Sequence, residues 1–206
     1  MVQFLIEPKM QDSWIIFGDY TSKKGCKTMK RINLIVLLLL NVIGSNEKAY
    51  ANTNNPPRPF EEIFPEVGYK SVDEAIKEFE DYFKQDLKLP LRHPPITFTH
   101  QFGRFSNLEG DSNDSFEVKF ISDKSPENHY KINVHPIKHK ILIPDKYVLK
   151  LVKLKNGNDA TYMNVSGFNI LVFERDTWQY FLSIDKRLSR KVTLEMLVDI
   201  ADSIDY

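Results

Sequence analysis

Two short stretches decide the fold class: residues 116–120, with the sequence FEVKF, and residues 130–134, with the sequence YKINV. In each stretch apolar side chains alternate with charged or amide side chains. A period of two places the apolar side chains on one face of a β-strand and the polar ones on the other. The pattern therefore predicts antiparallel strands with one face against a core and one face toward water.

Working outward, similar patterns predict strands at residues 97–105, 147–153, 160–165, 168–174 and 178–184. Turn-forming residues separate the later ones: Asn156-Gly157-Asn158-Asp159, Ser166-Gly167 and Arg175-Asp176. The stretch at 168–174 differs because both of its faces are apolar, with Ile170 and Val172 on one and Leu171 and Phe173 on the other. We expect this strand to be central and covered on both sides.

Helices are predicted at both ends of the strand region. Ser71 and Glu74 have the spacing of a capping box, and apolar residues follow at helical spacing to about residue 86. Thr193 is expected to cap a second helix that carries Leu197 and Ala201 on its apolar side. The sequence thus predicts one α+β domain at residues 71–206, a curved antiparallel sheet of about seven strands packed with an N-terminal and a C-terminal helix.

The apolar strand residues are predicted to point inward, toward the helix residues Ile76, Phe79, Phe83, Leu197 and Ala201. The predicted inward set is Phe116, Val118, Phe120, Tyr130, Ile132, Val134, Ile170, Val172, Trp178, Tyr180 and Leu182. If the sheet encloses a cavity, the residues expected to line an apolar pocket are Phe116, Val118, Phe120, Ile132, Val134, Trp178 and Tyr180. A packed interior is the favoured alternative, because empty apolar volume costs about 24 cal/mol per Å³.

Residues 29–51, MKRINLIVLLLLNVIGSNEKAYA, have the three parts of an export signal. Lys30 and Arg31 precede an apolar run, and Ala49-Tyr50-Ala51 is the small-x-small pattern that signal peptidase recognises, with cleavage before Asn52. The sequence therefore predicts a secreted or extracytoplasmic protein of the cell envelope. An uncleaved membrane anchor through residues 32–44 and a buried helix of a cytosolic domain are the alternatives.

The regions on either side of this signal are less regular. Residues 1–28 are interpreted as a mis-called extension ahead of a true start at Met29, with a genuine cytoplasmic pre-sequence as the alternative. Residues 52–70 begin with NTNNPPRPFEEIFP and are predicted to form a flexible or extended Pro/Asn-rich tether.

Composition excludes several function classes. Residues 1–51 hold seven of the chain's 28 basic and four of its 28 acidic residues, so residues 52–206 keep 21 and 24, a net charge of −3. We therefore expect no nucleic acid and no anionic membrane as partner, so that membrane contact is limited to the signal segment if it stays uncleaved. The only cysteine is Cys26, which excludes thiolate–zinc sites, iron–sulfur clusters and a cysteine nucleophile from the exported part.

No motif predicts catalytic, metal or cofactor residues. His135 and His139 are four residues apart, but Pro136 and the flanking alternation favour an extended segment over a helix that would bring them together. Asp111, Asn113 and Ser115 resemble part of a calcium loop, yet Phe116 replaces the required glycine. A solvated loop between strands is the preferred interpretation.

The segments SVDEAIKEF (residues 71–79), LKLPLRHPP (87–95) and VFERDTWQYFLSIDKRLSRKVTLEMLVDIADSI (172–204) resemble DUF4367, a bacterial envelope domain of unknown function. The resemblance implies exported or anti-sigma-like membrane proteins of Gram-positive bacteria and an outline similar to lipoprotein-carrier half-barrels. It implies no catalytic residues, and this chain departs from the family by the polar insertion SNLEGDSNDS at residues 106–115.

These observations favour an exported, non-enzymatic binding or interaction module whose partner is an envelope protein or an apolar small molecule. Three alternatives remain: a carrier of a lipid-like ligand, a hydrolase with an unrecognised site, and a purely structural or sensory envelope module. An apolar cavity would favour binding, clustered buried ionisable groups an enzyme, and a filled core with neither the structural module.

Overall fold

A computed structural model describes residues 58–107 and 114–205 of the chain, and the structural statements below concern these residues. The predictions for the export signal, its cleavage site at Ala49, Ala51 and Asn52, and the N-terminal extension lie outside them, as does most of the loop compared with a calcium site.

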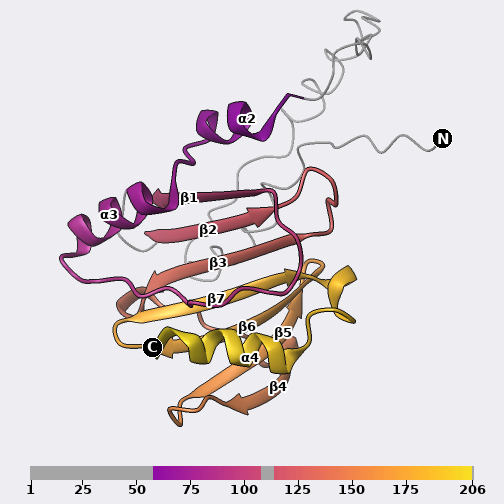
Figure 1. Cartoon of the computed structure of the whole chain (residues 1–206). Helices are drawn as coiled ribbons and strands as arrows, with labels where there is room; N and C mark the ends of the chain where they lie inside the picture. The colour runs from indigo at the N-terminus through magenta and orange to yellow at the C-terminus, as the bar shows by residue number, and fades with distance from the viewer. Residues whose placement is uncertain (1–57, 108–113, 206) are drawn as a thin grey trace, which may run out of the picture. The chain divides into compact units, whose positions relative to one another are not determined.

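Seven antiparallel strands form one open sheet in the order β1-β2-β3-β7-β6-β5-β4 (Figure 1). The strands are β1 (His100–Ser106), β2 (Ser115–Ile121), β3 (His129–Pro136), β4 (Val148–Lys153), β5 (Asp159–Val165), β6 (Phe168–Arg175) and β7 (Trp178–Asp185). Two meanders, β1 to β3 and β4 to β7, are joined by the pairing of β3 with β7. The predicted α+β class is confirmed, and the strand boundaries differ from the predicted ones by three residues at most.

Within the described residues three α-helices accompany the sheet: α2 (Phe60–Glu66), α3 (Val72–Phe83) and α4 (Leu194–Ala201). Both predicted caps are present: the Ser71 hydroxyl accepts from the Glu74 amide in a complete capping box, and the Thr193 hydroxyl accepts from the Met196 amide. α3 ends at Phe83 rather than near residue 86, because Lys84 adopts the left-handed conformation that terminates a helix.

The helices α3 and α4 pack on one face of the sheet, called the helix face here, and the interior between them is filled. Figure 1 shows α4 lying across the strands on this side. The core there combines helix residues such as Phe79 and Leu197 with strand residues such as Val118, Ile132 and Leu182. The central strand β6 is buried on both faces, as predicted.

The predicted facing of Ile170 and Val172 is wrong. Leu171 and Phe173 lie on the helix face, where they pair with Leu182 and Tyr180 of β7. Ile170 and Val172 belong to a second apolar cluster on the opposite face, called the far face here. That cluster is covered by Ile141, Ile143 and Tyr147, from the connection between β3 and β4.

Gly103 of β1 allows α3 to approach the sheet. A Cβ atom at this position would lie 2.8 Å from the Cα of Val72 and 2.9 Å from the Cβ of Ala75. Lys70 lies along the outer edge of β1 at the same point and exchanges two backbone hydrogen bonds of 2.9 Å with Gly103. The chain thus passes around the β1 edge just before α3 begins.

The prediction of a flexible or extended tether at residues 52–70 is wrong for its second half. Residues 60–66 form α2, and Phe64 of this helix stacks on Phe102 of β1 with ring centroids 4.6 Å apart. Tyr69, which follows α2, is buried, so the folded unit begins before residue 71. α2 has no side-chain cap and no buried residue of its own, so its contacts with the far face of β1 account for its place in the fold.

Candidate functional site

The seven residues predicted to line an apolar pocket lie together on the helix face, where they pack. Phe116, Val118, Val134, Trp178 and Tyr180 are at most 2% exposed, and Ile132 is 3% exposed. Phe120 is partly buried and packs against the same core. Of the seven, Trp178 alone lines the groove described next. Their packing supports a filled core over a carrier-like cavity.

An open groove of about 420 Å³ lies where α3, the end of β3 and the turn between β6 and β7 meet. Its lining comes from three separate parts of the chain: Phe83 and Gln85; Pro136, Ile137 and Lys138; and Asp176, Thr177 and Trp178. This volume lies within the range typical of small-molecule sites, about 300–1,000 Å³.

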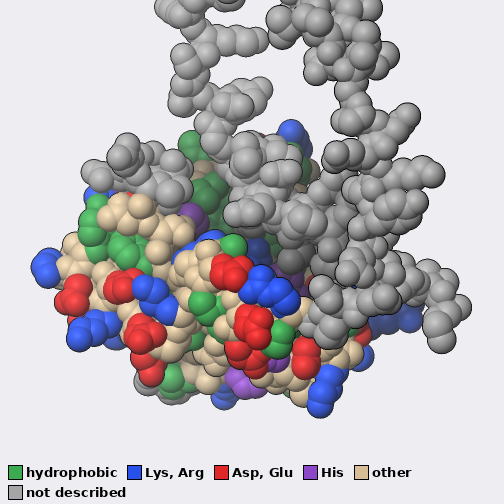
Figure 2. Space-filling model, turned by 90° about the horizontal axis from the view of Figure 1, so that it is seen from above, with side chains coloured by type: hydrophobic (Ala, Val, Ile, Leu, Met, Phe, Trp, Pro, Cys, Tyr) green, Lys and Arg blue, Asp and Glu red, His purple; other side chains and the backbone are tan. Residues whose placement is uncertain are grey.

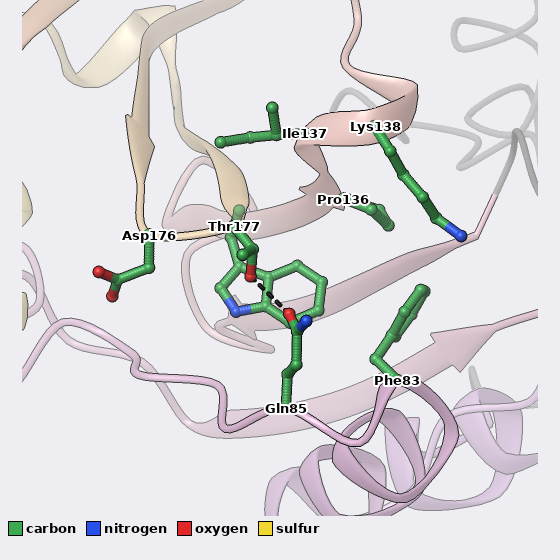
Figure 3. A pocket seen from close by; sticks show the side chains of 8 residues that line it. Phe83, Gln85, Pro136, Ile137, Lys138, Asp176 and Thr177 are labelled. Carbon is green, nitrogen blue, oxygen red and sulfur yellow. Dashed lines mark hydrogen bonds between the residues drawn. The ribbon is translucent and has the colours of Figure 1, made fainter.

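The groove combines aromatic walls with charged residues at its rim. The Phe83 and Trp178 rings meet edge to face, with centroids 5.3 Å apart. The Lys138 ammonium lies 5.7 Å from the centroid of the Phe83 ring, on the same side of the groove in Figure 3, whereas the Asp176 carboxylate lies on the other side. An apolar body with one anionic end would therefore match this lining.

Hydrogen bonds fix the wall that follows α3. The Thr177 hydroxyl donates to the Gln85 side-chain oxygen at 2.6 Å, the bond drawn in Figure 3. At the next position of each segment, the Trp178 indole donates to the Asp86 carbonyl oxygen at 3.1 Å. At the base of the same segment the Leu87 amide donates to the Glu80 carboxylate at 2.8 Å. These hydrogen bonds fix the backbone of the groove wall. Ligand binding therefore costs less conformational entropy than it would at a flexible site.

A second constellation of ionisable residues lies on the far face of β2 and β3, around Glu117. Its carboxylate accepts hydrogen bonds from the Tyr69 hydroxyl and from the Asn133 amide at 2.9 Å, and it lies 3.5 Å from the Lys119 ammonium. Burial alone would raise the pKa of Glu117, but the cations Lys131 and Lys119 and these hydrogen bonds hold it at about 2.

Cations of this cluster also form cation–π contacts with the Tyr69 ring. The Arg104 guanidinium and the Lys119 ammonium each lie 4.5 Å from the centroid of the Tyr69 ring. Burial, together with the Glu117 charge, raises the pKa of the Tyr69 hydroxyl, which stays protonated and donates to Glu117. Because these contacts join residues 64–70 to β1 and β2, the cluster anchors the N-terminal segment of the folded unit.

The far-face histidines His129, which is buried, and His135, which is half-buried, are not arranged as a metal site. Burial lowers the pKa values of His129 and His135 to about 4, and the positive charges of Lys131 and Lys119 add to the effect at His129. Within residues 58–107 and 114–205 no three His, Cys, Asp or Glu side chains converge closely enough to hold a metal ion.

Basic and acidic side chains are interspersed on the face of the molecule seen in Figure 2. No helix within the described ranges is long and apolar enough to cross a membrane. No family model, no curated protein and no solved structure matches this chain.

Sequence reasoning missed most of the groove. Phe83 was expected to face the core and Trp178 to face inward, but Gln85, Lys138 and Thr177 carried no signal, because each lies at the end of a strand or helix. Only the fold brings these ends together. The Glu117 cluster did carry a signal, since Glu117 and Lys119 alternate with Phe116, Val118 and Phe120, but alternation predicts a solvent-facing side and cannot show that α2 and Tyr69 cover it.

Proposed function

We propose that this chain is an exported, non-enzymatic binding module of the cell envelope, and that the groove at Phe83 and Trp178 holds a small amphiphile with an apolar body and an anionic end. The observation that carries the proposal is the groove itself, which has aromatic walls and Lys138 at its rim. Within the described residues the interior of the domain is packed with side chains and supplies no alternative cavity. The place in the envelope rests on the export signal that the sequence predicts at residues 29–51.

The non-enzymatic part of the proposal rests on the contacts and the pKa of Glu117. In the far-face cluster the Glu117 carboxylate is occupied by Tyr69, Asn133 and Lys119. Catalytic acids and bases need a pKa near the working pH, whereas the pKa of Glu117 is held at about 2. Its contacts instead fit a structural role in fixing the N-terminal segment.

Ligand binding can be followed through Trp178, which is the only tryptophan in residues 52–206. We expect the anionic dye 1-anilinonaphthalene-8-sulfonate to accept Trp178 emission in a saturable way, at one site per chain. Phe83→Ala should weaken this binding on the order of tenfold, because it removes an aromatic wall. Lys138→Ala should weaken it by roughly two- to fivefold, the size of an exposed ion pair.

The matched control is Lys146→Ala, which removes an exposed lysine outside the groove lining and should leave dye binding unchanged. Near-UV circular dichroism on each variant distinguishes a folded sample from a loosened one, which would bind the dye nonspecifically. A folded wild-type sample that shows no saturable energy transfer would overturn the groove assignment.

Export has a separate test. When the full chain is expressed in a bacterial host, N-terminal analysis of material outside the cytoplasm should give Asn52 as the first residue, because Ala49 and Ala51 fit the small pockets of signal peptidase. In the gene with its own upstream region, Met29→Leu should abolish expression if translation starts there. A mature form that retains residues 29–51 would contradict cleavage and favour the membrane anchor.

A further inference from the structure

The two edges of the sheet are treated differently. At β1 the outer edge is capped by Lys70, which forms a backbone bridge with Gly103. At the other end of the sheet β4 follows β5, and among the described residues no strand pairs with its outer side. An unpaired edge presents backbone donors and acceptors on which another chain can add a strand.

The register identifies which backbone groups of β4 face outward. Leu154 donates its amide to the carbonyl of Asn158 at 2.9 Å, and the pairs Val152↔Ala160 and Lys150↔Tyr162 continue the same register. Hydrogen-bonded pairs alternate along an antiparallel ladder, so these amides point toward β5. The amides of Leu151 and Lys153 therefore point away from the sheet.

The side chains at this edge are also unusual. Leu149 and Leu151 are 62% and 68% exposed, although edge strands are normally kept free of exposed apolar residues. Residues 145–155 also carry four lysines and a single carboxylate, that of Asp145. Only Lys153 among them forms an ion pair in the described structure, with Asp159 of β5, and both of those side chains are largely exposed.

We propose that β4 accepts an extended segment of a partner protein as an added strand, and that this segment alternates apolar residues with Asp or Glu. The apolar residues would cover Leu151 and the neighbouring Leu149, and the carboxylates, on the opposite side of the added strand, would meet Lys150. A second copy of β4 is a poor partner because it would place lysines beside lysines, and this repulsion selects for an acidic strand. The proposal is independent of the groove.

The test uses the exported form, residues 52–206, and a short synthetic peptide in which glutamate alternates with valine. We expect the peptide to bind and to slow amide hydrogen exchange at Leu151 and Lys153, while Lys150 and Val152 are protected with or without it. Leu151→Pro should weaken binding on the order of tenfold or more, because it removes an outward donor without breaking a bond to β5.

Two controls isolate the edge. Leu142→Ser changes an equally exposed leucine outside β4 and should leave peptide binding unchanged. The same peptide with lysine in place of glutamate should fail to bind. Absence of peptide binding at millimolar concentration, equal binding of the lysine peptide, or a dimer in solution whose β4 amides are protected without peptide would each overturn the proposal.

Discussion

Phe79→Ala is expected to lower the free energy of unfolding by about 3–5 kcal/mol, the usual cost of emptying a buried aromatic site. Phe79 is fully buried, and its ring contacts those of Phe105, Phe116 and Trp178, with centroids 5.4, 5.6 and 4.8 Å away. These partners come from β1, β2 and β7. The substitution therefore leaves a cavity where α3 packs against strands of both meanders.

Urea denaturation of the folded unit measures this loss. Lys77→Ala, on the exposed side of the same helix, should lie within about ±0.5 kcal/mol of wild type. Equal effects of the two substitutions would show that α3 does not dock through Phe79. Glu80 is unsuitable as the control because its carboxylate accepts the Leu87 amide.

Glu117→Ala is expected to cost a similar amount, about 3–5 kcal/mol, because it removes the carboxylate of a buried charge network. The Lys119 ammonium would lose its ion-pair partner, and the Tyr69 hydroxyl and the Asn133 amide would lose their acceptor. The matched control is Glu174→Ala, which removes a strand glutamate from a half-exposed ion pair with Lys140 and should cost at most about 1 kcal/mol.

The Glu117 carboxylate makes the free energy of unfolding depend on pH. Because the pKa of Glu117 is about 2 in the folded state and near 4.5 when unfolded, its contribution is fully present above the higher value. It is lost progressively as the pH falls from about 5 toward 2. Denaturation at pH 7 and pH 3 should therefore show a smaller acid loss for Glu117→Ala than for wild type, and equal losses would contradict the role assigned to Glu117.

The sequence predicted those elements whose pattern is local. Alternation at 116–120 and 130–134 placed Val118 and Ile132 on the correct face, and the capping box at Ser71 marked the start of α3. Alternation could not predict which face of β6 points toward the helices, because both faces of this strand are apolar. Leu171 turned inward and Ile170 outward only through the register with β7.

Features that depend on distant partners were not predictable from local patterns. α2 lacks a cap and an apolar stripe that is buried, so its sequence resembles a tether until Phe102 is brought beneath Phe64. Likewise, Thr177 and Gln85 are separated by 92 positions along the chain, yet they share a hydrogen bond in the groove wall.

The pairing of β3 with β7 has a consequence for the order in which the molecule can assemble. Tyr130 pairs with Ile184, and between these two residues lie β4, β5 and β6. A chain that is synthesised from its N-terminus can form the first meander, β1 to β3, early. One edge of β3 stays unpaired until β7, the last strand, has been made. Closing so large a loop is slow, so sheet formation is limited by this single non-local pairing. During that interval β3 is an unpaired edge whose apolar face is incompletely covered, and such an edge favours pairing with other chains until residues 178–185 arrive.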